Sequence, residues 1–171
     1  MLLIAGIAGS GGCSHPIAKE LRQAARKDLS FTTVFNDPMA YKGALVIWGG
    51  IIIGATNLPD GTEILVLETP LSSLGEPADD RFSEGRFIAK SPQFLDPEIY
   101  RKGRKLTVAG EIVGKEARQL GKIDYSYPVL SVKQLYLWTE PTLSYPPPYY
   151  APSWYWVETP IIIEKVPRKR D

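Results

Sequence analysis

Apolar residues run in short unbroken or alternating stretches along most of the chain, a pattern that predicts β-strands. Residues 44–57 are almost continuously apolar and rich in β-branched side chains, which favours one long strand. The pair Gly49 and Gly50 in its middle predicts a bulge or a sharp bend, because glycine tolerates close backbone approach. A Leu-Pro-Asp-Gly turn at 58–61 leads into residues 62–69, which are expected to form a hairpin with the first strand.

Three more strands are predicted farther along the chain. Residues 82–90 form one of them, with Gly85 as a bulge, and residues 105–112 alternate cleanly between apolar and polar positions. Residues 125–138 form a long final strand. Pro128 near its start indicates an edge or a break, because proline cannot donate a hydrogen bond to a neighbouring strand.

The N-terminal part of the chain has weaker signals. Residues 14–30 carry apolar positions at helical spacing between basic ones, and they predict a linker or a short amphipathic helix. Residues 31–35, Phe-Thr-Thr-Val-Phe, are typical of a short strand. Asp37 is then well placed to cap a helical turn that ends near Gly43.

A short helix is predicted between the third and fourth principal strands, over residues 95–103, where Asp96 is a suitable cap and Gly103 a suitable end. Three strands, a helix and two strands is the order of an OB-like Greek-key barrel. We therefore predict an all-β fold, a small β-barrel of five to six strands over residues 31–139, with extended N- and C-terminal tails. The C-terminal tail, residues 140–171, is rich in proline, tyrosine and tryptophan, which favours extended polyproline geometry.

Composition argues against several kinds of function. The chain has 20 basic and 19 acidic residues and a net charge of +1, so no general attraction to nucleic acid is expected. With one cysteine and one histidine, Cys13 and His15, it lacks the ligands of a structural zinc site, and neither a metal nor a cofactor is expected. A paired-carboxylate hydrolase would need two of Glu63, Glu68 and Glu111 to approach each other across separate strands. We expect no enzymatic activity.

Residues 1–13 pass from an apolar run to small residues and end in Cys13, which is typical of a bacterial lipoprotein signal. The run is too short to span a bilayer. In such a signal the cysteine receives diacylglycerol, and its acyl chains hold the protein at the membrane. Two alternatives remain for this segment. One is a phosphate loop, although no Lys-Ser or Lys-Thr follows the glycines, and the other is a buried strand end with an inert cysteine.

Between Asn36 and Trp138 the chain carries a series of short motifs in a fixed order. They are Asp37-Pro38-Met39-Ala40-Tyr41-Lys42-Gly43, Trp48-Gly49-Gly50, Leu67-Glu68-Thr69-Pro70-Leu71, Gly85-Arg86-Phe87-Ile88-Ala89, Phe94-Leu95-Asp96-Pro97 with Tyr100 and Gly103, Val108-Ala109-Gly110, Tyr125-Ser126-Tyr127-Pro128-Val129 and Leu137-Trp138. This series resembles the Slp family of bacterial outer-membrane lipoproteins, the starvation-inducible type. The resemblance implies a lipid-anchored protein of the outer membrane, linked to stress or stationary phase, whose domain faces the periplasm. It brings no established enzymatic activity, and it supports lipidation of Cys13.

Two functional hypotheses follow from these observations. The leading one is a membrane-tethered, non-catalytic structural or interaction protein of the cell envelope, whose partners would be the membrane itself and envelope proteins or peptidoglycan. The alternative is a ligand- or glycan-binding module that uses the barrel face or the aromatic tail. The aromatic candidates for ligand binding are Trp48, Tyr125, Tyr127 and Trp138, and Tyr125 and Tyr127 share one face of a strand because they lie two residues apart.

Overall fold

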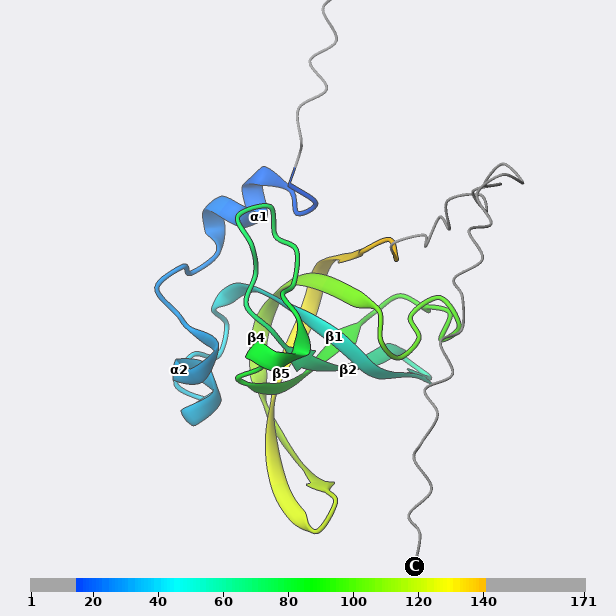
Figure 1. Ribbon diagram of the computed structural model, residues 1–171. Helices are drawn as coiled ribbons and strands as arrows, with labels where there is room; N and C mark the ends of the chain where they lie inside the picture. Colours follow the sequence, from blue (N-terminus) through cyan, green and yellow to red (C-terminus); the bar gives the residue numbers. More distant parts are fainter. Residues whose placement is uncertain (1–14, 141–171) are drawn as a thin grey trace, which may run out of the picture. The chain divides into compact units, whose positions relative to one another are not determined.

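The protein is built around five strands, as the all-β prediction requires. The computed structural model describes residues 15–140 (Figure 1). The strands are β1 (Leu45–Leu58), β2 (Gly61–Glu68), β3 (Gly85–Ser91), β4 (Lys105–Leu120) and β5 (Ile123–Leu137). Two short helices, α1 (Lys19–Ala24) and α2 (Phe31–Asn36), precede them, and a 3-10 turn, η1 (Asp80–Phe82), lies between β2 and β3. Within residues 15–140, every helix is too short or too polar to cross a lipid bilayer.

The strands form a closed ring in the order β1-β2-β3-β5-β4. All neighbours are antiparallel except β3 and β5, which run parallel where Ile88 lies opposite Val129. Every strand therefore has two neighbours, and β1 changes its partner along its length. Its first half, up to Ile51, pairs with β4, and its second half, from Gly50 onward, pairs with β2.

The backbones of three strands meet at Gly49 and Gly50. A Cβ atom built on Gly50 would overlap the carbonyl oxygen of Leu67, and one on Gly49 would overlap the side chain of Leu71. The predicted special role of the two glycines is therefore one of close approach. The register shift in β1 lies a little farther along the strand, between Ile52 and Gly54.

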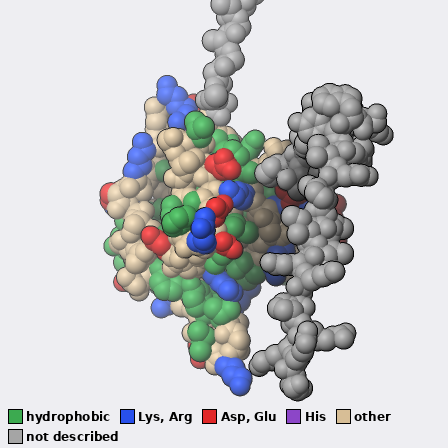
Figure 2. Space-filling view, viewed as in Figure 1, with side chains coloured by type: hydrophobic (Ala, Val, Ile, Leu, Met, Phe, Trp, Pro, Cys, Tyr) green, Lys and Arg blue, Asp and Glu red, His purple; other side chains and the backbone are tan. Residues whose placement is uncertain are grey.

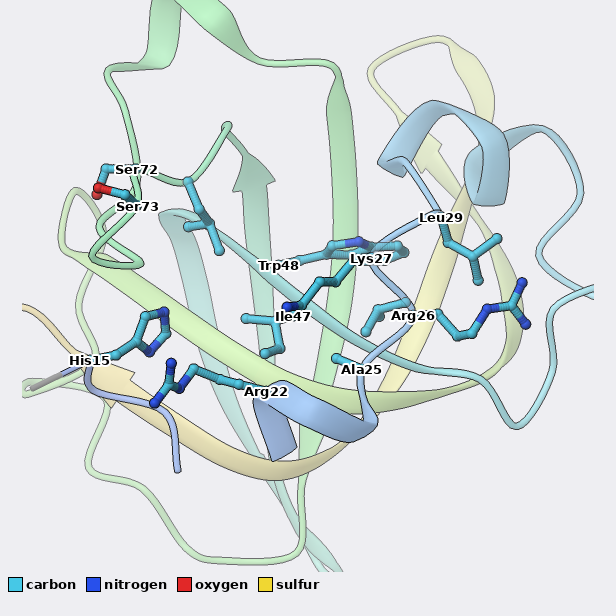
Figure 3. Close-up of a pocket in the computed structure, with 12 residues that line it drawn as sticks. His15, Arg22, Ala25, Arg26, Lys27, Leu29, Ile47, Trp48, Ser72 and Ser73 are labelled. Carbon is cyan, nitrogen blue, oxygen red and sulfur yellow. The ribbon is translucent and has the colours of Figure 1, made fainter. Parts of the chain in front are cut away.

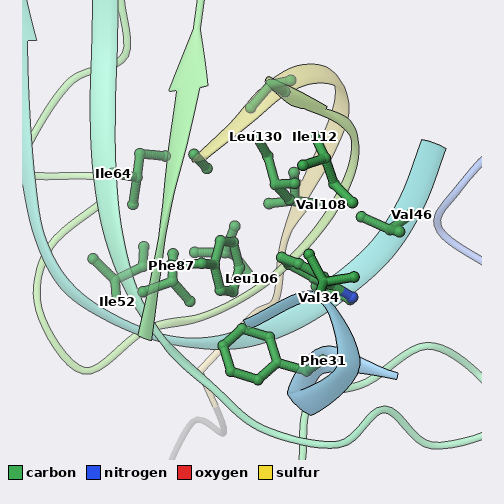
Figure 4. Close-up of a cluster of buried hydrophobic side chains, with 14 of the residues drawn as sticks. Phe31, Val34, Val46, Ile52, Ile64, Phe87, Leu106, Val108, Ile112 and Leu130 are labelled. Atoms are coloured by element: carbon green, nitrogen blue, oxygen red, sulfur yellow. The ribbon is translucent and has the colours of Figure 1, made fainter. Parts of the chain in front are cut away.

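The hydrophobic core fills the inside of the ring (Figure 4). Its fully buried members include Phe87 of β3 and several branched aliphatic residues of the other four strands, among them Ile52, Ile64, Leu106, Val108, Ile112 and Leu130. Phe31 and Val34 of α2 and Trp48 of β1 extend the core, and Trp48 contacts Phe87 with ring centroids 5.4 Å apart. The helix therefore packs as part of the core.

The prediction of a strand at 31–35 is wrong, since this segment forms the helix α2. The hydroxyl of Ser30 accepts a hydrogen bond from the backbone N–H of Thr33 at 3.1 Å, which caps the helix. Phe31 and Val34 are both buried, at the three-residue spacing of one helix face. The capped start and this spacing outweigh the strand preference of a β-branched and aromatic segment.

The predicted helix at 95–103 is also wrong, because only hydrogen-bonded turns form there. Asp96 does act as a cap, and its side chain accepts a hydrogen bond from the N–H of Glu98 at 2.9 Å. The segment is fixed at both ends: the N–H of Leu95 donates to Thr62 Oγ1, and the N–H of Gly103 donates to the carbonyl oxygen of Ile52. Between these two attachments to β2 and β1 the segment forms short turns and no helix.

The remaining strand predictions hold with shifted boundaries. The third strand begins at Gly85, because the residues before it form η1 and a short connection. The fourth and fifth strands make a long hairpin that turns near Gly121, and in Figure 1 this hairpin projects from the end of the ring opposite α1. Pro128 lies opposite Lys115, just before β5 begins to pair with β3 at Val129, so it occupies an edge as predicted.

Glu68, the last residue of β2, places a carboxyl group in a buried position. Its side chain is buried and accepts a hydrogen bond from the N–H of Glu84 at 3.3 Å. Burial raises the pKa of Glu68 to about 7, and the charge of Glu84 adds to this shift. The carboxyl is therefore largely protonated in the folded protein below neutral pH.

We expect Glu68→Gln to remove part of the pH dependence of stability. Because the pKa of Glu68 is higher in the folded than in the unfolded chain, its protonation stabilises the fold below about pH 4.5, and this stabilisation is lost as the pH rises through 7. Relative to the variant, the wild type should lose about 1–3 kcal/mol between these limits. Urea unfolding at a series of pH values measures the difference. Glu98→Gln, at an exposed position, should keep the wild-type profile, and an unchanged profile in Glu68→Gln would contradict the assignment.

We expect Gly50→Ala to destabilise the ring by more than about 3 kcal/mol, because the added methyl group overlaps the backbone of β2. Gly54→Ala is the matched control in the same strand, since a Cβ there meets no atom within 4 Å. The control should change the free energy of unfolding by less than about 1 kcal/mol. Chemical denaturation of both variants tests this, and equal effects would show that the close approach at Gly50 is unimportant.

Candidate functional site

The segment before the first strand is fastened to the ring. Ile17 is fully buried. On either side of it, the N–H of Ala18 donates to Gln134 Oε1 at 2.9 Å, and Gln134 Nε2 donates to the carbonyl oxygen of Pro16 at 3.1 Å. Farther along, the N–H of Arg26 donates to the carbonyl oxygen of Leu45 at 2.8 Å. The predicted linker or short helix is thus a docked part of the fold, with α1 in its middle.

A pocket of about 560 Å³ lies between this segment, β1 and the connection after β2 (Figure 3). We call it the N-terminal pocket. Its lining combines basic, hydroxyl and apolar side chains: His15, Arg22, Ala25, Arg26, Lys27, Leu29, Val46, Ile47, Trp48, Leu71, Ser72 and Ser73. Its volume is in the range of small-molecule sites in proteins.

The lining of the N-terminal pocket is positively charged. Three of its residues are cationic at neutral pH and none is acidic. Arg26 is compensated, since its guanidinium binds the carboxylate of Asp28 through two hydrogen bonds of 2.8 and 2.6 Å. Neither Arg22 nor Lys27 forms an ion pair within residues 15–140, although Arg22 Nε donates to the carbonyl oxygen of Ile17. The pocket therefore carries two positive charges that no carboxylate in the described part of the chain offsets.

His15 forms one end of the pocket. Its Nδ1 accepts a hydrogen bond from the N–H of Ile17 at 3.1 Å, which places the ring proton on Nε2 in the neutral form. Burial and the positive charge of Arg22 lower the pKa of His15, so the ring is neutral at pH 7. The ring packs against Gly75, where a Cβ would lie 2.6 Å from Nε2. This contact joins the N-terminal segment to the loop that supplies Ser72 and Ser73.

Trp48 belongs to both the core and the pocket. Its side chain is 5% exposed and contacts Phe31 with ring centroids 5.0 Å apart. Figure 3 shows its indole beside Lys27 and Ile47 among the pocket residues. Of the four aromatic residues predicted for ligand binding, Trp48 is the one that lines this pocket.

The other predicted aromatic residues lie elsewhere. Tyr125 and Tyr127 are adjacent as their spacing predicts, with ring centroids 4.5 Å apart, but Tyr127 is only 2% exposed and Tyr125 accepts a hydrogen bond from the N–H of Arg86. Trp138 Nε1 donates to Thr107 Oγ1 at 2.9 Å. A role of these three residues in ligand binding stays a prediction. Cys13 lies outside the described residues.

The three glutamates considered for hydrolysis have different surroundings. Glu63 binds Arg118 through two hydrogen bonds, Glu111 pairs with Lys133 at 3.1 Å, and Glu68 is buried. Within residues 15–140 no three potential metal ligands of the His, Cys, Asp or Glu type form a cluster. The N-terminal pocket is therefore the best candidate site, and its chemistry suits binding of an anion through charged hydrogen bonds.

The basic residues of the N-terminal pocket were not predicted from the sequence. Arg22 and Lys27 were visible only as polar positions of a short amphipathic segment. The accumulation of four Lys or Arg residues between positions 19 and 27, against one acidic residue, was the available signal. Their proximity to Trp48 and Ser72 depends on how the segment docks, which their spacing does not reveal.

Comparison with known proteins gives a consistent result. Residues 11–162 match the profile of the Outer membrane lipoprotein Slp family. An uncharacterized protein of Haemophilus influenzae (strain ATCC 51907 / DSM 11121 / KW20 / Rd) is 37% identical over 140 residues, which cover 81% of this chain and 75% of that protein. Outer membrane protein Slp of Escherichia coli (strain K12) is 29% identical over 109 residues, which cover 64% of this chain and 57% of that protein. No solved structure matches the chain.

The profile match covers most of the chain, and it includes both the ring and Cys13. The resemblance of the ordered motifs between Asn36 and Trp138 is thereby confirmed. This protein belongs to the Slp family of outer membrane lipoproteins and is a protein of the outer membrane.

Proposed function

We propose that this protein is anchored in the outer membrane by diacylglycerol on Cys13 and carries a non-catalytic domain that faces the periplasm. Its role is that of a structural or interaction protein of the cell envelope, connected with stress or starvation. The observation that carries the proposal is the position of Cys13, directly after an apolar and then glycine-rich run and inside the match to a lipoprotein family. Two or three acyl chains on one cysteine bind a bilayer almost irreversibly.

The fold supports a binding role more than catalysis. The ring order β1-β2-β3-β5-β4, with one parallel contact between β3 and β5, is the basis for proposing an OB-type Greek-key barrel. Barrels of this type commonly present a binding surface on a rigid closed sheet. The carboxylates of Glu63 and Glu111 each bind a basic partner, Arg118 and Lys133, and this arrangement disfavours a role for them in acid–base chemistry.

A second candidate function is a ligand-binding module in the periplasm. It is favoured by the N-terminal pocket, whose basic side chains stand beside the indole of Trp48. The two functions are compatible, because a tethered envelope protein can bind a small molecule or a glycan without transforming it.

We expect a clickable palmitate analogue to label the protein in living bacteria and Cys13→Ala to abolish the label. The thiol is the acceptor of the diacylglycerol, so the variant should also shift from the outer-membrane fraction to other fractions. Gel fluorescence after labelling and membrane fractionation measure the two effects. Ser14→Ala is the matched control, since it changes the neighbouring residue and keeps the thiol. Equal labelling of wild type and Cys13→Ala would refute the anchor.

A further inference from the structure

We propose that the N-terminal pocket binds the phosphate of an anionic lipid headgroup in the membrane to which the protein is anchored. The inference rests on the lipidation of Cys13 proposed above, which decides where the pocket lies. The charge, the hydroxyl groups and the apolar wall of the pocket all come from described residues.

The pocket has a positive charge that suits a phosphate group. Arg22 and Lys27 line the pocket, and neither is paired with a carboxylate anywhere in residues 15–140. Arg26 also lines it, but Asp28 binds its guanidinium, and Figure 3 shows that side chain directed away from His15 and Arg22. A guanidinium and an ammonium group together suit a phosphate, the first through directed hydrogen bonds and the second as a compact charge.

The pocket also contains neutral hydrogen-bond donors. Ser72 and Ser73 stand across the pocket from the basic side chains in Figure 3. Their loop is held in shape, because the N–H of Ser72 donates to the carbonyl oxygen of Glu76 at 2.8 Å and Ser72 Oγ accepts from the N–H of Glu76. Hydroxyl groups on a fixed loop opposite two cations can complete the hydrogen bonds of a phosphate group.

One wall of the pocket is apolar, which favours a lipid headgroup over free phosphate. Leu71, Ile47 and the indole of Trp48 form part of the same lining as the cations. Free inorganic phosphate has no surface that such a wall can bury. A phospholipid headgroup does, because its phosphate is joined to glycerol and to the first methylene groups of the acyl chains.

The pocket lies close in the sequence to the proposed lipid anchor. His15, at one end of the pocket, is two residues from Cys13 in the sequence, and two residues of any chain span at most about 7 Å. The polar headgroup region of a bilayer is about 5–8 Å thick on each side. A lipid on Cys13 therefore fixes this end of the ring at the level of the phosphates. Lys and Arg side chains are visible at the same end of the molecule in Figure 2.

Vesicle binding by the full chain carrying Cys13→Ser tests the proposal, because this variant cannot be lipidated. Co-sedimentation is compared for vesicles of phosphatidylcholine alone and for vesicles that also contain phosphatidylglycerol. The apolar residues near the start of the chain act equally on both kinds of vesicle. We expect a clear preference for the anionic vesicles, and the absence of any preference would overturn the proposal.

Variants in the same background locate the binding. Arg22→Gln combined with Lys27→Gln should weaken partitioning to the anionic vesicles about 10- to 30-fold. Lys102→Gln combined with Lys122→Gln makes the same change of charge at exposed positions outside the pocket and should weaken it less than about twofold. Lys19→Gln removes a cation of α1 that does not line the pocket. If it weakens partitioning as much as Lys27→Gln alone, the attraction is diffuse and the pocket assignment fails.

Two further measurements keep the test decisive. Circular dichroism verifies the fold. Lys27→Gln alone, at an exposed position, replaces the double variant if loss of the hydrogen bond from Arg22 to Ile17 unfolds the protein.

Calorimetric titration with inorganic phosphate tests whether the pocket binds free phosphate instead of a lipid headgroup. Phosphate binding that is as sensitive to Lys27→Gln, and that displaces the protein from the vesicles, would assign the pocket to free phosphate and overturn the lipid proposal. Loss of the palmitate label would refute the anchor without changing the vesicle result, so the two proposals can fail separately.

Discussion

Double pairing of β1 is the constraint on which the rest of the structure depends. One strand accepts β4 along its first half and β2 along its second, so the sheet closes on itself instead of ending in two open edges. The change of partner occurs where Gly50 lies opposite both Glu68 and Leu106, and the backbone of β2 passes too close there for a side chain. Ring closure also sets the interior volume that Phe87 and the branched aliphatic residues fill. The same crossing brings Glu68 to a buried position beside Gly85, where its carboxyl group is better tolerated in the neutral form.

The N-terminal pocket depends on this ring closure and on the N-terminal segment that docks against the ring. Trp48 lies on the part of β1 that pairs with β4, and its indole is held by Phe31 and Phe87. The N-terminal segment then docks beside β1 through the buried side chain of Ile17 and the two hydrogen bonds to Gln134. Basic residues that a linker would leave in solvent are thereby placed against the wall of the ring. A rigid sheet on one side and a docked segment on the other give the pocket its shape.

Much of the ring could be predicted from the sequence, because its strongest signals are local. The strands predicted at 44–57 and 62–69 agree with β1 and β2 to within one residue, since β-branched runs and a Pro-Asp-Gly turn determine them without distant contacts. The failures occurred where tertiary contacts decide. Residues 31–35 are helical because Phe31 and Val34 pack into the core, and 95–103 forms only turns between its attachments to β2 and β1. The pocket was not predictable for the same reason, as its residues come from three segments.

Charge distribution explains how a protein with a net charge of +1 can present a basic site. Many of its carboxylates bind basic partners elsewhere, as in the group formed by Glu63, Arg118, Glu116 and Lys90 on the ring surface. Ion pairs near the surface contribute little stability, but these pairs neutralise charge locally and leave an excess of positive charge at the pocket. If Cys13 holds the protein in the bilayer, headgroups surround the pocket at a high effective concentration, so even a weak site is occupied. Binding there would add little to the strength of anchoring. Its effect would be to fix orientation, with the projecting β4–β5 hairpin at the end of the ring away from the membrane, where other components of the envelope can reach it (Figure 1).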